Sequence, residues 1–359
     1  MKIILSLLLT LMFIQFGNTQ TCYITNTGTT YHNDSSCGRL RSINVVSYEK
    51  IKHAYKPCST KKCSVARKEL GIDTTLQPDS NGNTVENIPT SSSNLITSGR
   101  YLKAYNNSIK LLTWNIQDLG RTKDVDEIDA IVNVLRNFDL VAIQEVVSKD
   151  PAGAQKVAAI ADLLNRTGSQ WDYRISDPTD SPSPNIRERY AYLWKTAKLT
   201  LLGRPELDSD LAHICDREPY LAEFKTKQGY TFHTVNFHSR PHNKNPESEV
   251  TNFSNYPQRL DSKNVVILGD FNMDENNTVW KSLYDQGFEP SVRNSPTTLK
   301  HRCDGRNYLN HSIDNIYINA SSFHVEDAGR VDIVGGCNNL EIARGISDHL
   351  PVYSIIRFL

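Results

Sequence analysis

A short apolar run, Val265-Val266-Ile267-Leu268, is followed by Gly269 and Asp270, with Asn272 two residues further on. Four branched apolar residues in succession predict a strand that is buried on both faces and ends where polar residues begin. In extended backbone, the side chains of Asp270 and Asn272 would leave the same face, where they could hold a phosphate and a water molecule. A turn that uses Asp and Asn for its backbone geometry is the simpler alternative.

The same change from an apolar strand to a polar residue recurs at four other places. The polar residues are Asn115 after residues 109–114, Glu145 after residues 139–144, His238 after residues 230–237, and Asp348 with His349 after residues 346–347. Turn chemistry does not readily explain five strand ends that carry these residue types. We therefore expect a single site, assembled at one edge of packed sheets.

The remaining pattern predicts a few helices and many strands. An amphipathic helix is indicated by apolar residues at helical spacing, namely Val125, Ile128, Ile131, Val132 and Leu135. A second helix is expected at residues 152–165, which are rich in Ala and Leu. Strands are expected at residues 171–176, 189–195, 199–204, 220–226 and 230–237. These elements favour an α/β fold of two packed β-sheets flanked by helices.

Composition divides the chain into four parts. Residues 1–19 have a charged start and an apolar core too short to span a bilayer, which indicates a secretory signal peptide. Residues 72–105 are rich in Asp, Thr, Ser, Asn and Gly and predict a flexible linker. The linker separates a small Cys-rich module at residues 20–71 from a domain of catalytic size at residues 106–359. No later run is apolar enough to cross a membrane, so we expect a secreted, extracellular protein.

The formal net charge of zero conceals an asymmetry between the two parts. Residues 21–71 carry nine Lys and Arg against three Asp and Glu, whereas residues 72–359 carry 30 against 37. The small module is therefore basic, at about +6, and the large domain acidic, at about −7. The module could bind polyanions near an acidic enzyme, or it could be a solvated surface without a partner.

The seven cysteines fall into two groups. Four lie in the small module, at Cys22, Cys37, Cys58 and Cys63. In a secreted module of this size two disulfides are favoured, and a zinc site that includes His32 is the alternative. The three in the large domain are Cys215, Cys303 and Cys337. We expect Cys303 to pair with Cys337, because the Gly-Gly turn before Cys337 could bring it back toward Cys303. Cys215 would then have no partner within the domain.

Eight short motifs resemble those of the endonuclease/exonuclease/phosphatase superfamily, and most of all its deoxyribonuclease I branch. They are Thr113-Trp114-Asn115-Ile116, Ile143-Gln144-Glu145-Val146, Glu188-Arg189-Tyr190, Arg217-Glu218-Pro219, His238-Ser239, Gly269-Asp270-Phe271-Asn272, Ser312-Ile313-Asp314-Asn315-Ile316 and Ser347-Asp348-His349-Leu350-Pro351-Val352. One tetrapeptide is weak evidence, but eight in the same order are specific. The resemblance covers residues 107–359 and implies a four-layer α/β sandwich that cleaves DNA. The small module also resembles Cys/His modules attached to secreted nucleases.

The resemblance pairs Glu188 with His238 and Asp314 with His349, on opposite sides of the scissile phosphate. A carboxylate on one imidazole nitrogen fixes the tautomer, so that the other nitrogen can transfer a proton near neutral pH. We assign His349 with Asp314 to the base that activates water. We assign His238 with Glu188 to the acid that protonates the leaving oxygen.

The resemblance also implies a metal site. It places the divalent ion on Glu145, with Asn115 and Asp348 nearby. Such oxygen ligands suit Mg²⁺, or Mn²⁺ and Ca²⁺, rather than zinc. Asp270 and Asn272 would orient water and phosphate.

Arginines near the motifs are predicted to bind substrate. The counterpart of Arg217 in the deoxyribonuclease I branch contacts a backbone phosphate, and Arg189 and Arg240 could add contacts that carry no sequence information. Residues 177–187, which include three prolines, form a predicted irregular loop of the kind that contacts substrate.

The sequence thus predicts a secreted, monomeric, metal-dependent endonuclease that hydrolyses DNA with little sequence specificity. This chain has Ile186 where that branch has a tyrosine, and Gln117 and Val147 where it has arginines, so we expect an altered grip on the minor groove. Three alternatives remain open. They are a phosphodiesterase or phosphatase acting on a lipid or inositol phosphate, an inactive binding protein, and a toxin delivered by the small module.

Overall fold

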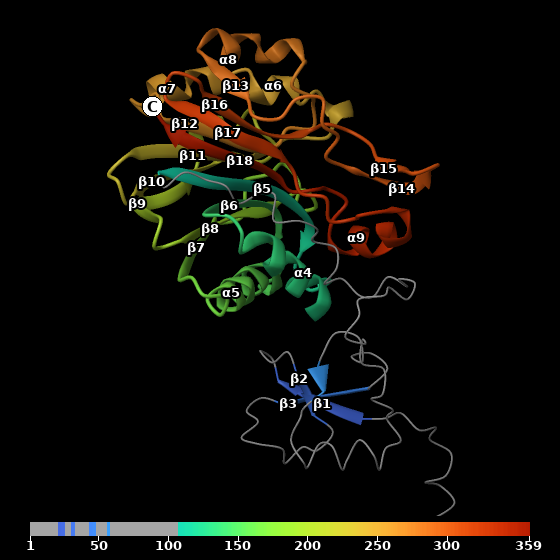
Figure 1. Ribbon diagram of the computed structural model, residues 1–359. Helices are drawn as coiled ribbons and strands as arrows, with labels where there is room; N and C mark the ends of the chain where they lie inside the picture. The colour runs from blue at the N-terminus through green and yellow to red at the C-terminus, as the bar shows by residue number, and fades with distance from the viewer. Residues whose placement is uncertain (1–20, 26–29, 33–42, 48–55, 58–106) are drawn as a thin grey trace, which may run out of the picture. The chain divides into compact units, whose positions relative to one another are not determined.

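The computed structural model describes residues 21–25, 30–32, 43–47, 56–57 and 107–359 (Figure 1). The chain divides into two compact units, Met1–Asn94 and Leu95–Leu359. In the first unit, a four-stranded sheet has the order β3-β1-β2-β4. Its strands are β1 (Thr21–Thr25), β2 (Thr30–His32), β3 (Ile43–Ser47) and β4 (Lys56–Pro57). The predicted signal peptide, the linker and the cysteine side chains of the module lie outside the described parts.

The second unit is built on two six-stranded sheets. One has the order β17-β18-β5-β6-β8-β7, and the other β13-β16-β12-β11-β10-β9. The strands of the first are β5 (Ser108–Leu119), β6 (Leu140–Val147), β7 (Trp171–Ile175), β8 (Glu188–Lys195), β17 (Phe323–Arg330) and β18 (Val352–Phe358). The strands of the second are β9 (Leu199–Leu207), β10 (Tyr220–Thr226), β11 (Thr231–His238), β12 (Val265–Asp270), β13 (Phe288–Pro290) and β16 (Asp314–Asn319).

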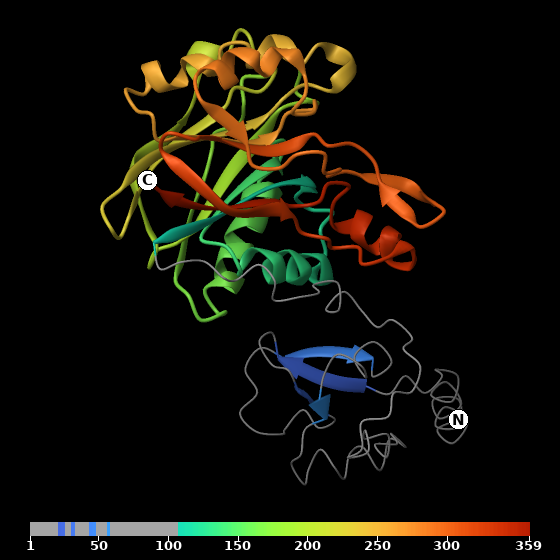
Figure 2. The same ribbon diagram turned by 45° about the horizontal axis from the view of Figure 1, so that its top comes forward.

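Helices cover the outer faces of both sheets, which makes four layers (Figures 1 and 2). The first sheet is covered by α4 (Val125–Leu135), α5 (Ala152–Leu164) and α9 (Leu340–Ile346). The second is covered by α6 (Glu247–Val250), α7 (Tyr256–Arg259) and α8 (Lys281–Asp285). Short 3₁₀ turns are η3 (Ser209–Leu211), η4 (His242–Lys244), η5 (Phe253–Asn255), η6 (Thr278–Trp280) and η7 (Cys337–Asn339). The predicted fold class is confirmed.

Strand β12 shows why the central apolar run is continuous. Val266 and Leu268 pack between the two sheets, while Val265 and Ile267 pack against the outer helices. Because successive side chains of a strand point to opposite faces, the part of a strand that is covered on both faces by apolar cores is apolar at successive positions. All six residues of β12 are buried. Leu268 leads directly to the polar strand end.

Helix α4 begins with a capping box, in which the Asp124 carboxylate accepts from Glu127 N and the Glu127 carboxylate accepts from Asp124 N. Ile128 and Leu135 are buried as expected. The prediction that Val125 shares this buried face is wrong, because its side chain is 74% exposed and packing starts one turn later. None of the helices in the described residues is long and apolar enough to cross a membrane.

Candidate active site

Strand register alone brings three polar residues together at one end of the second sheet. The parallel pairing of β11 with β12 places His238 opposite Asp270. The antiparallel pairing of β12 with β16 places Asp270 opposite Asp314. These three residues lie side by side on neighbouring strands, so their side chains are close although the first and the last are 76 positions apart in the sequence.

Irregular strand pairing in the first sheet brings two more residues, Glu145 and Glu188, toward these three side chains. The register of β6 against β8 shifts between Ile143 and Val146, and within that interval Glu145 has a φ of 60°. A bulge of this kind turns a side chain away from its regular direction. The backbone N–H of Glu145 donates to Glu188 Oε1 at 3.2 Å. Glu188 is the first residue of β8.

The loop after α9 positions His349 through backbone contacts. Ser347 Oγ donates to Asn115 O at 2.7 Å and accepts from His349 N at 3.0 Å. Trp114 Nε1 donates to His349 O at 2.9 Å. His349 also pairs with Thr298 in an isolated β-bridge. The backbone of the histidine is therefore held against the middle of β5, at Trp114 and Asn115.

Each histidine ring faces a buried carboxylate through Nδ1. His238 Nδ1 lies 3.0 Å from Glu188 Oε2, and His349 Nδ1 lies 2.9 Å from Asp314 Oδ2. In both pairs the carboxylate is the natural acceptor for an Nδ1 proton, which leaves Nε2 available for chemistry. The two pairs predicted from the resemblance are thus within hydrogen-bonding distance.

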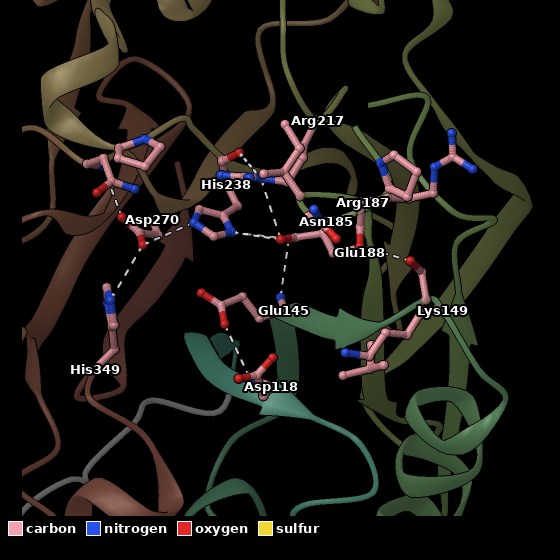
Figure 3. A pocket seen from close by; sticks show the side chains of 16 residues that line it. Asp118, Glu145, Lys149, Asn185, Arg187, Glu188, Arg217, His238, Asp270 and His349 are labelled. Carbon is pink, nitrogen blue, oxygen red and sulfur yellow. Dashed lines mark hydrogen bonds and ion pairs between the residues drawn. The ribbon is translucent and has the colours of Figure 1, made fainter. Parts of the chain in front are cut away.

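Asp270 lies between the two histidines (Figure 3). Its Oδ2 is 3.5 Å from His238 Nε2 and 3.6 Å from His349 Nε2. Asn115 Nδ2 donates to the same oxygen at 3.1 Å and to Glu145 Oε1 at 2.9 Å. The result is a continuous row of side chains in the order Glu188, His238, Asp270, His349 and Asp314. Both Nε2 atoms of this row face the Asp270 carboxylate.

The carboxylates control the protonation of both imidazoles. Burial disfavours the charged form of His349, but Asp314 and Asp270 outweigh it and raise the pKa of this imidazole to about 10. Burial and the Arg217 cation likewise oppose protonation of His238. The carboxylates of Glu188 and Asp270 outweigh them, so the pKa of His238 is also raised.

Asn272 reaches the site by a different route from the one predicted. Its φ is 51°, so the extended backbone ends at Asp270 and the chain turns. Asp270 Oδ1 accepts from Asn272 N at 2.9 Å, and Asn272 Nδ2 donates to Ser239 O at 3.2 Å. The expectation that both side chains share one face of extended backbone is therefore wrong. The turn geometry considered as the alternative is present.

The row opens into a cleft of about 410 Å³. Glu145, Glu188, His238, Asp270, Asn272 and His349 line it, together with Asp118, Lys149, Asn185, Arg187 and Arg217. Residues 184–187, from the proline-rich loop, form part of one wall. Val147 and Ile186, two of the positions at which the sequence departs from the deoxyribonuclease I motifs, also line the cleft.

Two groups of ligand atoms in the described residues could bind a cation. Asn115 Oδ1 is buried, and no described group donates to it, while the adjacent Glu145 carboxylate faces the cleft. An amide oxygen beside a carboxylate fits a hard divalent cation such as Mg²⁺. A second set, Asp270 with Asp314 and His349, has donor atoms within 4.8 Å of one another.

The remaining predicted metal ligand, Asp348, is placed elsewhere. It lines a neighbouring cavity, and it is absent from the residues that line the cleft. Its backbone carbonyl accepts from Leu299 N at 2.8 Å. Asp348 therefore lines the neighbouring cavity, whereas Glu145 lines the cleft.

Of the three predicted arginines, one lines the cleft. Arg217 is buried, donates from Nε to His238 O at 3.1 Å and lies 3.5 Å from Glu188 Oε2. Arg189 instead donates to Ser176 O at 2.7 Å, outside the cleft.

Arg240 also lies outside the cleft. Its guanidinium contacts Asp216 Oδ1 at 2.8 Å and Glu249 Oε1 at 3.1 Å. The sequence places Arg240 close to His238, but the side chain is engaged in a separate charged cluster. The predicted substrate contacts of Arg189 and Arg240 are therefore not supported by their positions.

Two residues that support the site were not predicted from the sequence. Thr297 Oγ1 donates to Asp314 Oδ2 at 2.6 Å and accepts from Asp314 N, which fixes the carboxylate that orients His349. Asp118 N donates to Glu145 Oε2 at 3.2 Å. Neither residue follows an apolar strand in a way that signals its role, since Thr297 lies in a loop and Asp118 is defined by its backbone geometry, with a φ of 50°.

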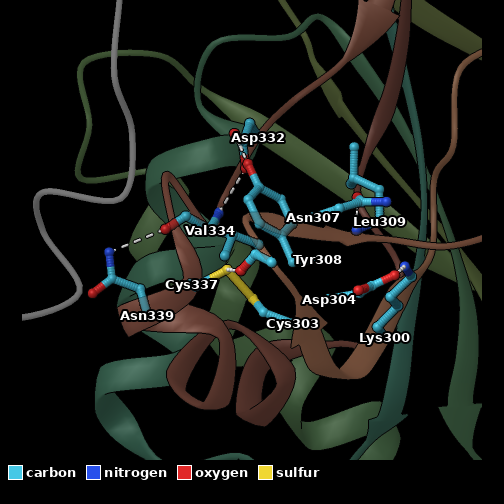
Figure 4. The surroundings of a disulfide bond; sticks show 11 residues. Lys300, Cys303, Asp304, Asn307, Tyr308, Leu309, Asp332, Val334, Cys337 and Asn339 are labelled. Atoms are coloured by element: carbon cyan, nitrogen blue, oxygen red, sulfur yellow. Dashed lines mark hydrogen bonds and ion pairs between the residues drawn. A yellow bond between two sulfur atoms is a disulfide. The ribbon is translucent and has the colours of Figure 1, made fainter.

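One disulfide is present among the described residues (Figure 4). Cys303 in the hairpin of β14 (Leu299–Asp304) and β15 (Asn307–Leu309) is bonded to Cys337 in η7. The predicted pairing is confirmed. Among the described residues Cys215 is the free cysteine, and it is buried.

The chain is similar in sequence to two deoxyribonucleases. A deoxyribonuclease from Thioalkalivibrio sp. (strain K90mix) is 29% identical over 266 residues, which cover 68% of this chain and 70% of the relative. Deoxyribonuclease-1 from Bos taurus is 29% identical over 179 residues, which cover 46% of this chain and 61% of the relative.

Solved structures share the fold. An endonuclease/exonuclease/phosphatase from Bacteroides vulgatus superposes with a TM-score of 0.53 at 15% identity, and covers 70% of this chain and 99% of its own. A family protein from Bacteroides thetaiotaomicron gives a TM-score of 0.51 at 16% identity, with coverage of 70% and 98%. The sequence pattern of the endonuclease/exonuclease/phosphatase family matches residues 112–349, which is more than half of the chain. The chain therefore belongs to the endonuclease/exonuclease/phosphatase family.

Proposed function

We propose that this protein is a divalent-metal-dependent endonuclease that hydrolyses the phosphodiester bonds of DNA with little sequence specificity. The observation that carries the proposal is the row in which Asp270 Oδ2 lies within 3.6 Å of both imidazole Nε2 atoms. Such a row offers proton transfer on two sides of one phosphate. The deoxyribonuclease relatives support DNA as the substrate.

The two imidazoles take opposite roles in the proposed reaction. In-line hydrolysis needs a base for the attacking water and an acid for the departing sugar oxygen. His349, oriented by Asp314, accepts the proton of the water at Nε2. His238, oriented by Glu188, donates a proton from Nε2 to the leaving oxygen as the P–O bond breaks. Asp270, between them, orients the water.

Asn115 and Glu145 would hold the metal in this proposal. Their amide and carboxylate oxygens lie beside the row, and Asn115 Nδ2 already fixes the Glu145 carboxylate at 2.9 Å. A divalent cation here would neutralise charge on the phosphoryl oxygens and favour the neutral form of the nearby imidazoles. The donor set suits Mg²⁺, with Mn²⁺ or Ca²⁺ as substitutes.

The walls of the cleft suit a phosphate backbone rather than particular bases. Lys149 and Arg187 are exposed and line the cleft, and Asn185 adds an amide. Contacts of this kind position a nucleic acid without reading its sequence. We therefore propose that Arg187 and Lys149, and not Arg189 or Arg240, hold the phosphates that flank the scissile bond.

The proposal extends to the place where the enzyme works. A disulfide persists in oxidising compartments, so the Cys303–Cys337 bond fits a protein exported by the predicted signal peptide. We propose a secreted, extracellular monomer. Its basic N-terminal module would bind polyanions such as the DNA substrate.

A substrate panel tests the proposal. The purified chain is incubated with supercoiled plasmid, single-stranded DNA, RNA, a phosphoinositide and sphingomyelin, each with Mg²⁺ and with EDTA. We expect conversion of supercoiled to nicked plasmid in Mg²⁺ and none in EDTA. Turnover of the phosphoinositide or sphingomyelin without nicking would replace the nuclease with a lipid phosphodiesterase or phosphatase of the same family. Nicking that persists in EDTA would refute the proposed requirement for a divalent metal.

A further inference from the structure

A second cavity, of about 330 Å³, lies next to the cleft. The two share one lining residue, His349, so the second cavity begins where the proposed chemistry takes place. Its other lining residues come from the β14–β15 hairpin, the loop that precedes β16, and the region of α9. None of these segments contributes otherwise to the cleft.

The walls of the second cavity are held in place from behind. Arg344 Nη1 in α9 donates to Leu299 O at 2.9 Å, which ties the hairpin to the helix. The Cys303–Cys337 disulfide makes a second connection between the hairpin and the segment that leads into α9 (Figure 4). His311 N donates to Thr298 Oγ1 at 2.9 Å. The cavity is therefore a built feature rather than a gap between loose loops.

The lining of the second cavity favours an anionic ligand. Lys300 and Arg344 bring two cationic groups, and His301 and His311 bring two imidazoles. Of the residues that line it, Asp348 alone carries a carboxylate. Among the described residues, Lys300 has one ionic contact, with the exposed Asp304 at 3.7 Å, and such exposed pairs contribute little and are easily exchanged for a phosphate.

An aromatic surface lies at the boundary between the cleft and the second cavity. The rings of His242 and His311 stack, with centroids 6.3 Å apart and an interplanar angle of 29°. Both residues are exposed. His311 lines the second cavity, and Pro241, which precedes His242, lines the cleft. Imidazole faces in this position can stack with a nucleobase, since every base has a π-face.

We propose that the second cavity is a subsite for the nucleotide next to the scissile phosphate. Lys300 contacts its phosphate, and the His242–His311 pair stacks on its base. This inference rests on the proposed nuclease function and adds to it the direction in which the strand leaves the catalytic row, over His349 toward the hairpin. The subsite recognises a backbone phosphate and a π-face, so it binds any nucleotide.

Steady-state kinetics on a short fluorescent DNA duplex test the subsite. Lys300→Glu should raise KM about ten-fold while kcat stays within two-fold, because the lost contact lies beside the reacting atoms and not on them. Log affinity should also depend less steeply on log salt, by about one, for the loss of one phosphate contact. Lys300→Arg should retain a KM close to that of the wild type.

His311→Ala tests the stacking surface independently. Loss of one stacked base should raise KM roughly five-fold or more. The side chain is exposed, so the thermal melt should not change. The matched control for Lys300→Glu is Lys225→Glu, which makes the same charge reversal at an exposed position of β10. We expect this variant to cleave with the kinetics of the wild type.

The outcomes separate the two proposals. A wild-type chain that does not cleave the duplex in Mg²⁺ refutes the nuclease function. A wild type that cleaves, together with Lys300→Glu and His311→Ala variants whose KM is unchanged, refutes the subsite and leaves the nuclease intact. A lower kcat at unchanged KM would also overturn the subsite, because it would show that these residues act on the catalytic row.

Discussion

Replacing Asp270 with Asn removes one negative charge from the middle of the row and changes the shape of the side chain very little. Asp270 Oδ2 lies 3.5 Å from His238 Nε2 and 3.6 Å from His349 Nε2, so both imidazoles lose the same neighbour. Oδ1 can continue to accept from Asn272 N, which lies 2.9 Å away. The substitution therefore tests charge and proton transfer more than packing.

The size of the effect follows from these distances. At an effective dielectric constant of about 20, two unit charges about 3.5 Å apart interact by roughly 5 kcal/mol. Loss of the carboxylate should therefore lower the pKa of both histidines. The new amide nitrogen would face Asn115 Nδ2, which already donates to this position at 3.1 Å, and two facing donors cost about 1–3 kcal/mol. We expect a small loss of stability and a nicking rate at least ~10²-fold lower.

Plasmid nicking in saturating Mg²⁺ measures the rate, and NMR titration of the histidine ring protons in EDTA measures both pKa values. The matched control is Asp274→Asn, because Asp274 is exposed and lies only four residues further along the chain. A D270N variant that nicks within three-fold of the wild-type rate would refute the proposed role of Asp270. Unchanged histidine pKa values would refute the electrostatic argument.

Three further predictions concern stability, pH and metal binding. Gly269→Ala should lower the melting temperature sharply or prevent folding, since Gly269 has a φ of +147° and an added Cβ would lie 1.8 Å from Phe237 O; an unchanged melt would contradict the close pairing of β11 with β12. In EDTA, the free energy of unfolding should fall as pH rises from about 6.5 to about 10. The raised pKa of His349 gives stability that is fully present below the unfolded pKa and is lost as pH approaches about 10. Urea titrations at several pH values check this, and a His349→Asn variant with the same slope as the wild type would contradict it. Glu145→Gln should weaken Mg²⁺ binding at least ten-fold by calorimetry, and equal affinity would remove Glu145 from the ligand set.

The fold and the broad position of the site were predictable because they depend on local patterns. Continuous apolar runs marked the doubly buried strands, and residues at strand ends such as His238 and Glu145 marked the edge where the site lies. Parallel pairing then brings these ends together without further information. The motif order supplied the pairing of each histidine with its carboxylate.

The parts that the sequence did not reveal depend on backbone conformation and on distant contacts. The residues around Asn272 allow both an extended strand end and an Asp/Asn turn, and only the structure shows that the φ of Asn272 is positive. Thr297 contacts Asp314 across a loop, and the hydrogen bond is visible only in three dimensions. Arg189 follows Glu188 directly but contacts Ser176, because alternate residues of a strand point to opposite faces. Nearness to a motif did not predict direction.

The account depends most on the two imidazoles acting on one phosphate. His238→Asn and His349→Asn each keep a donor near the partner carboxylate but remove the Nε2 atom. We predict that each variant remains folded at the assay temperature but nicks supercoiled plasmid at least ~10²-fold more slowly than wild type. His324→Ala, at an exposed position on β17, serves as the control and should nick at the wild-type rate. Wild-type nicking by either active-site variant would contradict the account.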